Sequence, residues 1–299
     1  MRHTTALPML SLAVLTMLAQ GGCWGSGDEK FVGSSELKVA KTASAPSTDP
    51  RSALWNGAQE TKVALMPQSI VYPLLGKQSV TSLRVRALLD DQWLAVRLEW
   101  DDRQRDDKLE VDKFTDAIAI EMPIREPQKT NPMMGSAEYP VYILHWKAAW
   151  QKDVDVGHHA DVQEYHPGYW ADPYPFVEGR YPYDVSESFQ SDNARRYFAA
   201  TSAGNPIAKL YRKWPVEELH AEGFGSLADH NFQDAQGKGV WENGKWSVVV
   251  SVPRQTADKE NPSLASGMTT AMAFALWDGS NQNVGGRKHW ASFVKVVLP

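Results

Sequence analysis

The sequence predicts a mainly β fold, an antiparallel β-sandwich with little helix. Three observations favour it: apolar and polar residues alternate with a period of two along many short segments, turn-forming residues separate these segments, and helical periodicity is weak. Strands of this number and spacing are typical of a sandwich. A chain of 299 residues, 42% of them hydrophobic, is long enough to bury a sizeable core.

The first clear strands are residues 80–89, "VTSLRVRALL", and residues 92–100, "QWLAVRLEW". An acidic dipeptide separates them as a turn, so the two segments predict a hairpin. Residues 114–122, "FTDAIAIEM", and residues 139–146, "YPVYILHW", have the same strand-like composition.

Residues 239–253, "GVWENGKWSVVVSVP", contain the strongest hairpin signal, because an Asn-Gly dipeptide between aromatic strands is typical of a type I′ turn. Residues 269–279, "TTAMAFALWDG", and residues 290–299, "WASFVKVVLP", complete the expected strands. The best candidate for one short turn or helix is residues 215–225, "PVEELHAEGFG".

The chain divides by composition into three parts. Residues 1–22 carry basic residues before a short apolar run, which is typical of a signal peptide, so we expect an exported, periplasmic protein. Small residues before Cys23 resemble a lipoprotein signal, and Cys23 is then a candidate lipid anchor. Residues 23–55 are expected to be a flexible tether. Residues 56–299 form the folded domain, interrupted at 147–205 by a long Pro- and Tyr-rich insertion.

Several classes of function are excluded by composition and motif. The net charge is −5 without a long basic block, so the chain has no electrostatic footprint for nucleic acid. It contains no GxSxG, HExxH or phosphate-binding glycine loop, so we expect no catalytic site of its own. A single cysteine excludes an internal disulfide and a CxxCH haem attachment. The 12 tryptophans favour a β-rich core or a site for a flat ligand.

Two segments carry candidate metal-binding residues. Met133 and Met134 lie in a loop flanked by Pro and Gly, and a thioether is a soft ligand for haem iron or copper; the alternative is that both fill the core. Near the C-terminus, a Gly-Gly pair precedes Lys288 and His289. This segment is either a solvated basic turn or a ligand-bearing one. His289 would ordinarily be the better ligand, because a lysine, whose ordinary pKa is about 10.4, must first lose its proton.

Several stretches occur in order along residues 60–299: "DAIAIEMP", "MMGS", "PVYILHWKA", "GNP", "PVEELHAEGFGSL", "GKGVWENGKWSVVV" and "MAFALWDGSNQNVGGRK". Together they resemble the haem b-binding γ subunits of periplasmic molybdenum enzymes related to ethylbenzene dehydrogenase. Dimethyl sulfide dehydrogenase, selenate reductase, chlorate reductase and some nitrite oxidoreductases have such subunits. Of the stretches, "AEGFGSL" and "WDG" with "GGRK" are the most specific.

The resemblance implies a β-sandwich that binds one non-covalent haem b between a methionine and a lysine, on loops at one end. By the family pattern these axial ligands are Met134 and Lys288, with Met133 and His289 as the substitutes if the alignment shifts by one. Gly285 and Gly286 would let the backbone approach the porphyrin closely.

The resemblance also implies the partners. It predicts an electron-transfer subunit in an αβγ complex with a molybdopterin catalytic subunit and an iron–sulfur subunit. Electrons would pass between the iron–sulfur subunit and a soluble cytochrome or quinone-linked carrier. Two alternatives remain: a secreted sandwich that binds carbohydrate through aromatic residues without a cofactor, and a family member that has lost its haem.

Overall fold

The computed structural model describes residues 36–43, 48–108, 110–160, 203, 212–256 and 258–299. All of them belong to the second of two compact units, Phe31–Pro299. The expected signal peptide, Cys23 and most of the insertion at 147–205 lie outside the described residues. Within the described part of the chain, no helix combines the length and the apolar character needed to cross a bilayer.

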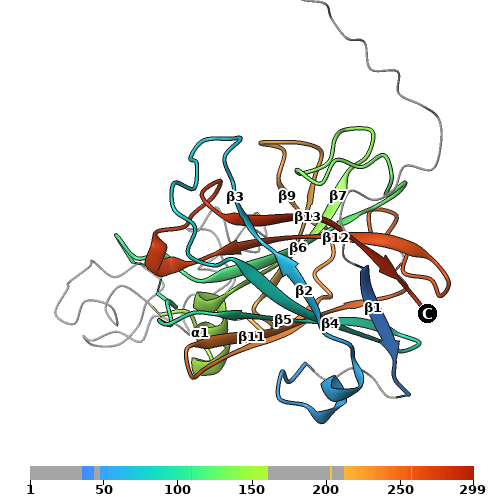
Figure 1. Cartoon of the computed structure of the whole chain (residues 1–299), viewed down its shortest axis with the longest axis horizontal. Helices are drawn as coiled ribbons and strands as arrows, with labels where there is room; N and C mark the ends of the chain where they lie inside the picture. Colours follow the sequence, from blue (N-terminus) through green and yellow to red (C-terminus); the bar gives the residue numbers. More distant parts are fainter. Residues whose placement is uncertain (1–35, 44–47, 109, 161–202, 204–211, 257) are drawn as a thin grey trace, which may run out of the picture. The chain divides into compact units, whose positions relative to one another are not determined.

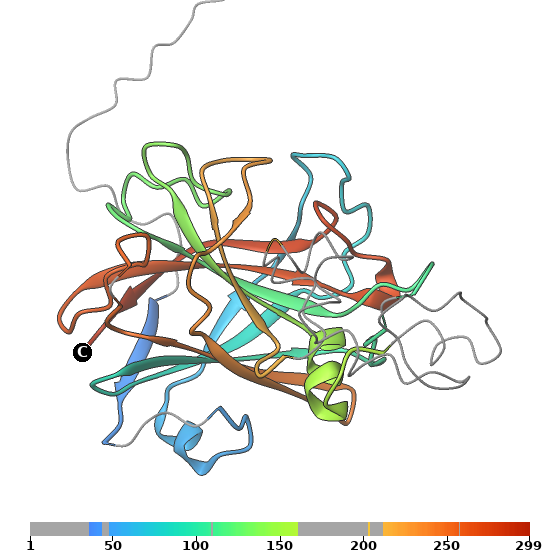
Figure 2. The same ribbon diagram turned by 180° about the vertical axis from the view of Figure 1, so that it is seen from behind.

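The described strands form two layers that share one strand, β1, as Figures 1 and 2 show from opposite sides. Sheet B has the order β10-β11-β5-β4, with β2 beside β4; sheet A has the order β13-β12-β6-β7-β8-β9, with β3 beside β13. This confirms a mainly β, sandwich-like fold. The strands are β1 (Glu36–Lys41), β2 (Thr61–Ala64), β3 (Met66–Pro67), β4 (Ser82–Leu89), β5 (Trp93–Asp101), β6 (Ala117–Pro123), β7 (Val141–Lys147), β8 (Val216–Ala221), β9 (Ala228–Asp229), β10 (Gln236–Glu242), β11 (Lys245–Pro253), β12 (Thr269–Trp277) and β13 (His289–Val297).

Strand β1 joins the two sheets. Residues 36–38 pair in parallel with β13, and residues 39–41 pair in parallel with β4. Leu37 and Val39 point into the core. The expected flexible tether over residues 23–55 is therefore wrong for this strand, and the sandwich is not antiparallel throughout. The physical reason is the alternation in "ELKVAK", which buries one face of an extended strand.

The expected hairpins are present. Strand β4 pairs with β5, and β10 pairs with β11 through Asn243 and Gly244, both of which have the positive φ of a type I′ turn (52° and 71°). Of the short turn or helix expected within residues 215–225, the helix is wrong: residues 216–221 form β8, paired with β7 and β9, and a turn follows at residues 224–225. Pairing with two neighbours outweighs the weak helical preference of this segment. A short helix, α1 (Ala148–Val156), instead begins directly after β7.

The core lies between the sheets and includes a cluster of three fully buried tryptophans. The ring of Trp146 contacts the rings of both Trp100 and Trp246, with ring-centroid distances of 6.3 Å and 4.9 Å. Trp100 and Trp246 stack at 6.2 Å. These residues explain part of the high tryptophan content as internal packing.

Replacing Trp146 with alanine is expected to destabilise the fold by about 3–5 kcal/mol, because a fully buried indole leaves a large cavity. Denaturant unfolding followed by circular dichroism measures this loss. Trp93→Ala, at a partly buried position of β5, is the control and should cost clearly less. Equal losses in the two variants would show that the tryptophan cluster is not central to stability.

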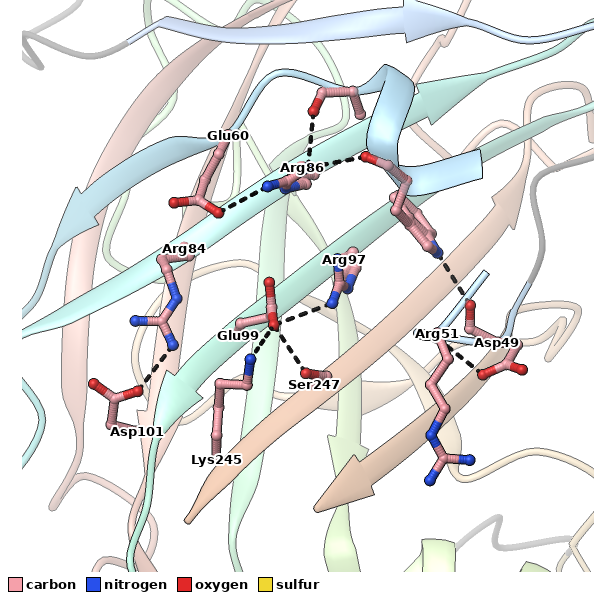
Figure 3. Close-up of polar contacts among 12 residues, drawn as sticks. Asp49, Arg51, Glu60, Arg84, Arg86, Arg97, Glu99, Asp101, Lys245 and Ser247 are labelled. Carbon is pink, nitrogen blue, oxygen red and sulfur yellow. Dashed lines mark hydrogen bonds and ion pairs between the residues drawn. The ribbon is translucent and has the colours of Figure 1, made fainter. Parts of the chain in front are cut away.

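The outer face of sheet B is charged (Figure 3). Alternate residues of β4, β5 and β11 point outward there, and their charges pair across the strands. The pairs are Arg84–Asp101 at 2.9 Å, Arg97–Glu99 at 3.1 Å, Lys245–Glu99 at 3.0 Å and Arg86–Glu60 at 3.2 Å. This part of the face is a paired polar surface in which Glu99 is buried (5% exposed), whereas Leu88, Ala95 and Val249 on the same face pack against Trp55 and Ala58.

Candidate functional site

An apolar cavity of about 550 Å³ lies on the outer face of sheet A. Its volume is in the range of small-molecule and cofactor sites, which is about 300–1,000 Å³. Strands β6, β7, β8 and β12 contribute its floor, and segments around residues 68–72, 113–115, 132–134, 224–227 and 283–288 contribute its walls. The cavity therefore lies against a sheet face, with loops around it.

Small side chains make room for the cavity. Ala119, Ala273 and Ala275 occupy outward positions on β6 and β12, and all three line the cavity. In the register of the sheet, Ala275 lies opposite Ala119. The alternate, inward positions carry large residues such as Ile118 and Phe274 in the core. A strand that alternates small and large side chains thus packs densely on one face and leaves space on the other.

Larger aromatic and aliphatic side chains make up most of the remaining floor and walls. The residues of this kind that line it are Val71, Tyr72, Phe114, Ile143, Leu219, Phe224, Leu227, Trp277, Val284 and Trp290. Tyr72 and Phe224 are strongly exposed in the described structure, with 85% and 56% of their surface accessible. Such a lining favours a flat apolar ligand over a highly polar one.

Met134 lines the cavity in an unusual backbone conformation. Its φ is 71°, in the left-handed region that few non-glycine residues adopt, and Gly135 follows with a φ of 66°. The carbonyl of Met134 accepts a hydrogen bond from the amide of Gly223 at 2.7 Å, so two loops hold this conformation. Met133 also lines the cavity. A backbone kept in a sparsely populated conformation indicates that the position of this residue is important.

Lys288 enters the cavity from a tight turn. Val284 and Arg287 pair across the turn with backbone hydrogen bonds of 3.1 Å and 2.9 Å, and Gly285 has the positive φ (55°) that the turn needs. The indole of Trp277 donates to the carbonyl of Gly285 at 3.0 Å. These contacts fix the chain just before Lys288.

The segment around Gln68 supports the same turn from outside. The side-chain amide of Gln68 donates to the carbonyl of Gly286 at 2.7 Å, and its backbone amide donates to the carbonyl of Lys288 at 2.9 Å. A Cβ on Gly286 would lie 3.2 Å from the carbonyl oxygen of Pro73. Gly286 therefore allows close packing against this neighbouring loop, in addition to lining the cavity.

Burial shifts Lys288 toward the neutral amine, although neighbouring groups oppose the shift. Burial lowers its pKa from the ordinary value near 10.5, while the negative charge of Glu121 opposes this shift. Glu121 itself is buried beside it, and burial raises its pKa to about 8, against the charge of Lys288 and a backbone hydrogen bond from Met134. The Nζ atom of Lys288 lies 5.0 Å from the ring centroid of Trp277. An unprotonated lysine is thus less costly here than on a surface.

His145 is a further residue of the cavity that sequence reasoning did not select. It lies on β7 opposite Ala119, and its Nε2 atom is buried without a hydrogen-bond partner. Burial first, and then the charges of Lys147 and Lys288, hold its pKa well below the usual value of 6.5. It is a neutral imidazole on the cavity floor. The signal in the sequence was a lone histidine at an outward position of "VYILHW".

The structure brings Met133, Met134, Gly285, Gly286 and Lys288 together around one cavity. His289 does not line this cavity.

The ring of His289 is directed elsewhere and fully occupied. Its Nε2 atom accepts hydrogen bonds from the backbone amides of Ser79 and Val80 at 3.0 Å and 3.2 Å, and its Nδ1 atom lies 3.3 Å from the carbonyl of Leu276. The alternation of β13 sends neighbouring side chains to opposite faces, so Lys288 and His289 cannot exchange roles without a shift in register.

Comparison with known proteins gives a family and two relatives. A model of the family described as ethylbenzene dehydrogenase matches residues 52–289. The chain is 23% identical over 257 residues to the chlorate reductase subunit gamma of Ideonella dechloratans, covering 84% of this chain and 80% of that protein. It is 22% identical over 240 residues to a protein of Haloferax mediterranei assigned as a respiratory nitrate reductase heme subunit, covering 80% of this chain and 64%, just under two thirds, of that protein.

Among solved structures, one similar fold is a family 9 carbohydrate-binding module from Caldicellulosiruptor kristjanssonii in complex with glucose. Its identity is 7%, its TM-score is 0.41, and the match covers 88% of this chain and 95% of that one. A similarity this low carries no argument about ligand or function.

Proposed function

This chain belongs to the ethylbenzene dehydrogenase family, and we propose that it is the haem b electron-transfer subunit of an exported molybdopterin oxidoreductase complex. In this role it relays electrons between an iron–sulfur subunit and a soluble cytochrome or quinone-linked carrier, and the chemistry of the substrate takes place on the catalytic subunit. The names of the two relatives, a gamma subunit and a heme subunit of reductases, support the proposal.

One observation carries the proposal. Met134 and Lys288 are far apart in sequence, come from different loops, and line the same apolar cavity. A thioether and a neutral amine are both donors that iron accepts. The alternating alanines of the floor add space for a flat ring.

The residues present fit a haem. The lining is mostly apolar, burial favours the unprotonated form of Lys288, and Met134 is held in a fixed backbone conformation. When bound, the haem supplies reversible one-electron chemistry between ferric and ferrous iron. Met134 and Lys288 would occupy both axial positions, so no position remains for oxygen or substrate. A sulfur donor and an uncharged amine favour a relatively high potential.

Export and attachment are part of the same proposal. The expected signal peptide at residues 1–22 would direct the chain to the periplasm, and a lipid on Cys23 would attach it to a membrane.

Titration of the purified full-length chain with haemin tests the proposed function. We expect one haem per chain, a low-spin six-coordinate spectrum in both redox states, and no spectral change with carbon monoxide. Ala119→Phe, which fills the cavity floor, should reduce haem uptake strongly, whereas Ala64→Phe at an exposed position of β2 should not. A protein that stays colourless and binds glycans would reject the proposal in favour of the carbohydrate-binding alternative.

Acid is expected to displace the lysine ligand. Iron binds only the neutral amine, so protons compete with iron, and the affinity of Lys288 for iron should fall about tenfold per pH unit below the pKa of the free amine. Burial lowers that pKa, which extends six-coordination toward lower pH. A spectrophotometric pH titration with folding monitored in parallel measures the transition from low spin to high spin.

The control for this titration is His145→Gln, which should keep the same transition because His145 is not the proposed ligand. A transition that disappears in this variant, or a low-spin spectrum that persists until the protein unfolds, would contradict ligation by Lys288.

A further inference from the structure

Three buried carboxylates meet at one end of the sandwich, outside the proposed haem site. Asp102, Asp116 and Asp278 are 6%, 0% and 6% exposed, and each offers an oxygen that lies within 4.8 Å of the others. Asp102 follows β5 of sheet B, Asp116 precedes β6 of sheet A, and Asp278 follows β12. The cluster therefore connects the two sheets.

The carboxylates are held in place by the surrounding chain. Asp116 accepts hydrogen bonds from the amides of Asp106 and Gly279 at 2.8 Å and 2.9 Å and from the indole of Trp246 at 2.9 Å. Asp278 caps the short 3-10 helix Gly279–Asn281 and accepts from the amide of Asn281 at 3.2 Å. The surrounding chain thus keeps the side chains of Asp116 and Asp278 in position.

Asp102 supplies the second observation. Its Oδ1 atom accepts a hydrogen bond from the amide of Gln104 at 3.1 Å. Its Oδ2 atom is buried without a well-formed hydrogen bond, although the indole of Trp100, whose Nε1 atom is also unpaired, partly stabilises the carboxylate. Leaving a buried carboxylate oxygen with so little stabilisation is costly. A carboxylate in this position, beside two other buried carboxylates, is what a cation site provides.

The electrostatics agree with this geometry. Burial raises the pKa of Asp102 to about 6, and the charges of Asp278 and Asp106 add to the shift, while the amide of Gln104 and the indole of Trp100 oppose it. Burial and the charge of Asp102 raise the pKa of Asp116 to about 8. The carboxylates thus repel one another, and a bound cation relieves this repulsion.

We propose that Asp102, Asp116 and Asp278 bind a calcium ion that ties the ends of β5, β6 and β12 together. Three hard oxygen donors and no nitrogen or sulfur favour an alkaline-earth ion. Calcium–oxygen distances are about 2.3–2.6 Å, so oxygens on opposite sides of the ion lie roughly 5 Å apart. Mutual distances of no more than 4.8 Å therefore allow all three carboxylates to reach one ion. Magnesium needs shorter distances and a stricter octahedron.

The site adjoins the cavity. Thr115, Ala117 and Trp277 line the cavity and are direct sequence neighbours of Asp116 and Asp278. The ion would therefore brace the end of the sandwich from which the wall at residues 113–115 and the turn before Lys288 extend. The proposal does not depend on haem binding.

Metal analysis and thermal unfolding of the full-length, haem-free chain test the proposal. We expect one calcium per chain as purified or, after removal by EGTA, a saturable rise in Tm of at least about 5 °C when calcium is restored. Asp102→Asn should abolish this response. Asp101→Asn, which removes the same charge at an exposed neighbouring position, should keep it. If Asp102→Asn fails to fold, Asp278→Asn serves in its place.

Terbium gives a second measurement. Because the indole of Trp246 lies 2.9 Å from Asp116, excitation of tryptophan should sensitise the emission of Tb³⁺ in the site, and calcium should quench that emission by displacement. If the wild-type protein contains no bound metal and its Tm does not change with calcium, the proposal is overturned. The three carboxylates would then be stabilised by a proton that they share. An equal calcium response in Asp102→Asn would overturn it as well.

Discussion

Replacing Lys288 with alanine should convert the haem-loaded protein from a six-coordinate, low-spin state to a five-coordinate, high-spin state. The side chain is the only proposed ligand on its side of the iron, and the alanine methyl group cannot reach it. Haem affinity should fall by at least about 10- to 100-fold, since losing even an outer-shell partner of a metal ligand costs that much. Optical spectra and haem transfer to an apo-globin measure the two effects.

Three controls separate loss of a ligand from general damage. Lys295→Ala removes an exposed lysine of β13 that pairs with Glu36 at 3.2 Å, and it should leave the spectrum unchanged. Added methylamine should restore the low-spin spectrum of Lys288→Ala by entering the space left by the side chain. A low-spin spectrum that survives in Lys288→Ala but is lost in His145→Ala would assign the ligand to the histidine of the floor.

Replacing Met134 with histidine should keep six-coordination but lower the midpoint potential by on the order of 0.1 V or more. Imidazole lacks the preference of thioether sulfur for ferrous iron, and axial ligands are among the strongest determinants of haem potential. The backbone should tolerate the change, because histidine is enriched among non-glycine residues with positive φ, and Met134 has a φ of 71°. Potentiometric titration measures the shift.

Met133→His is the matched control for this experiment, since Met133 also lines the cavity. If Met134 is the ligand, Met133→His should leave the potential within a few hundredths of a volt. A large shift in Met133→His with none in Met134→His would move the sulfur ligand by one residue. No shift in either variant would reject a methionine ligand.

The strand pattern was readable from the sequence because it depends on local alternation. The first six residues of β4 alternate regularly, so their buried face follows directly from the period of two. Strands β5 and β11 alternate only in part, because Ala95 and Val249 on the outer face are buried as well. The same signal was present in "ELKVAK", where Leu37 and Val39 are buried, but its position between polar stretches concealed a strand that joins both sheets. Pairing with β13 and β4 at a distance in sequence is what makes that short segment a strand.

The candidate ligands were assigned by resemblance to a family. The residues that surround them could be identified only from the tertiary structure. Nothing local in the sequence shows that Glu121 lies beside Lys288 or that His145 faces the same space. Register decides this, because Glu121 lies opposite Ile143 and Ala119 lies opposite His145 across β6 and β7. A shift of one residue would send all four side chains to the other face.

The sequence alone thus determined the β class and most strand positions, because each of these depends on neighbouring residues. The two loops with a candidate sulfur and amine ligand came from the family resemblance. Only the tertiary structure showed that the cavity lies on the outer face of sheet A, and that three aspartates from two sheets meet at its end. Both features arise from contacts between segments distant in sequence. Burial then changes the chemistry of the residues involved, since the pKa of Lys288 falls and the pKa of Asp116 rises when water is removed.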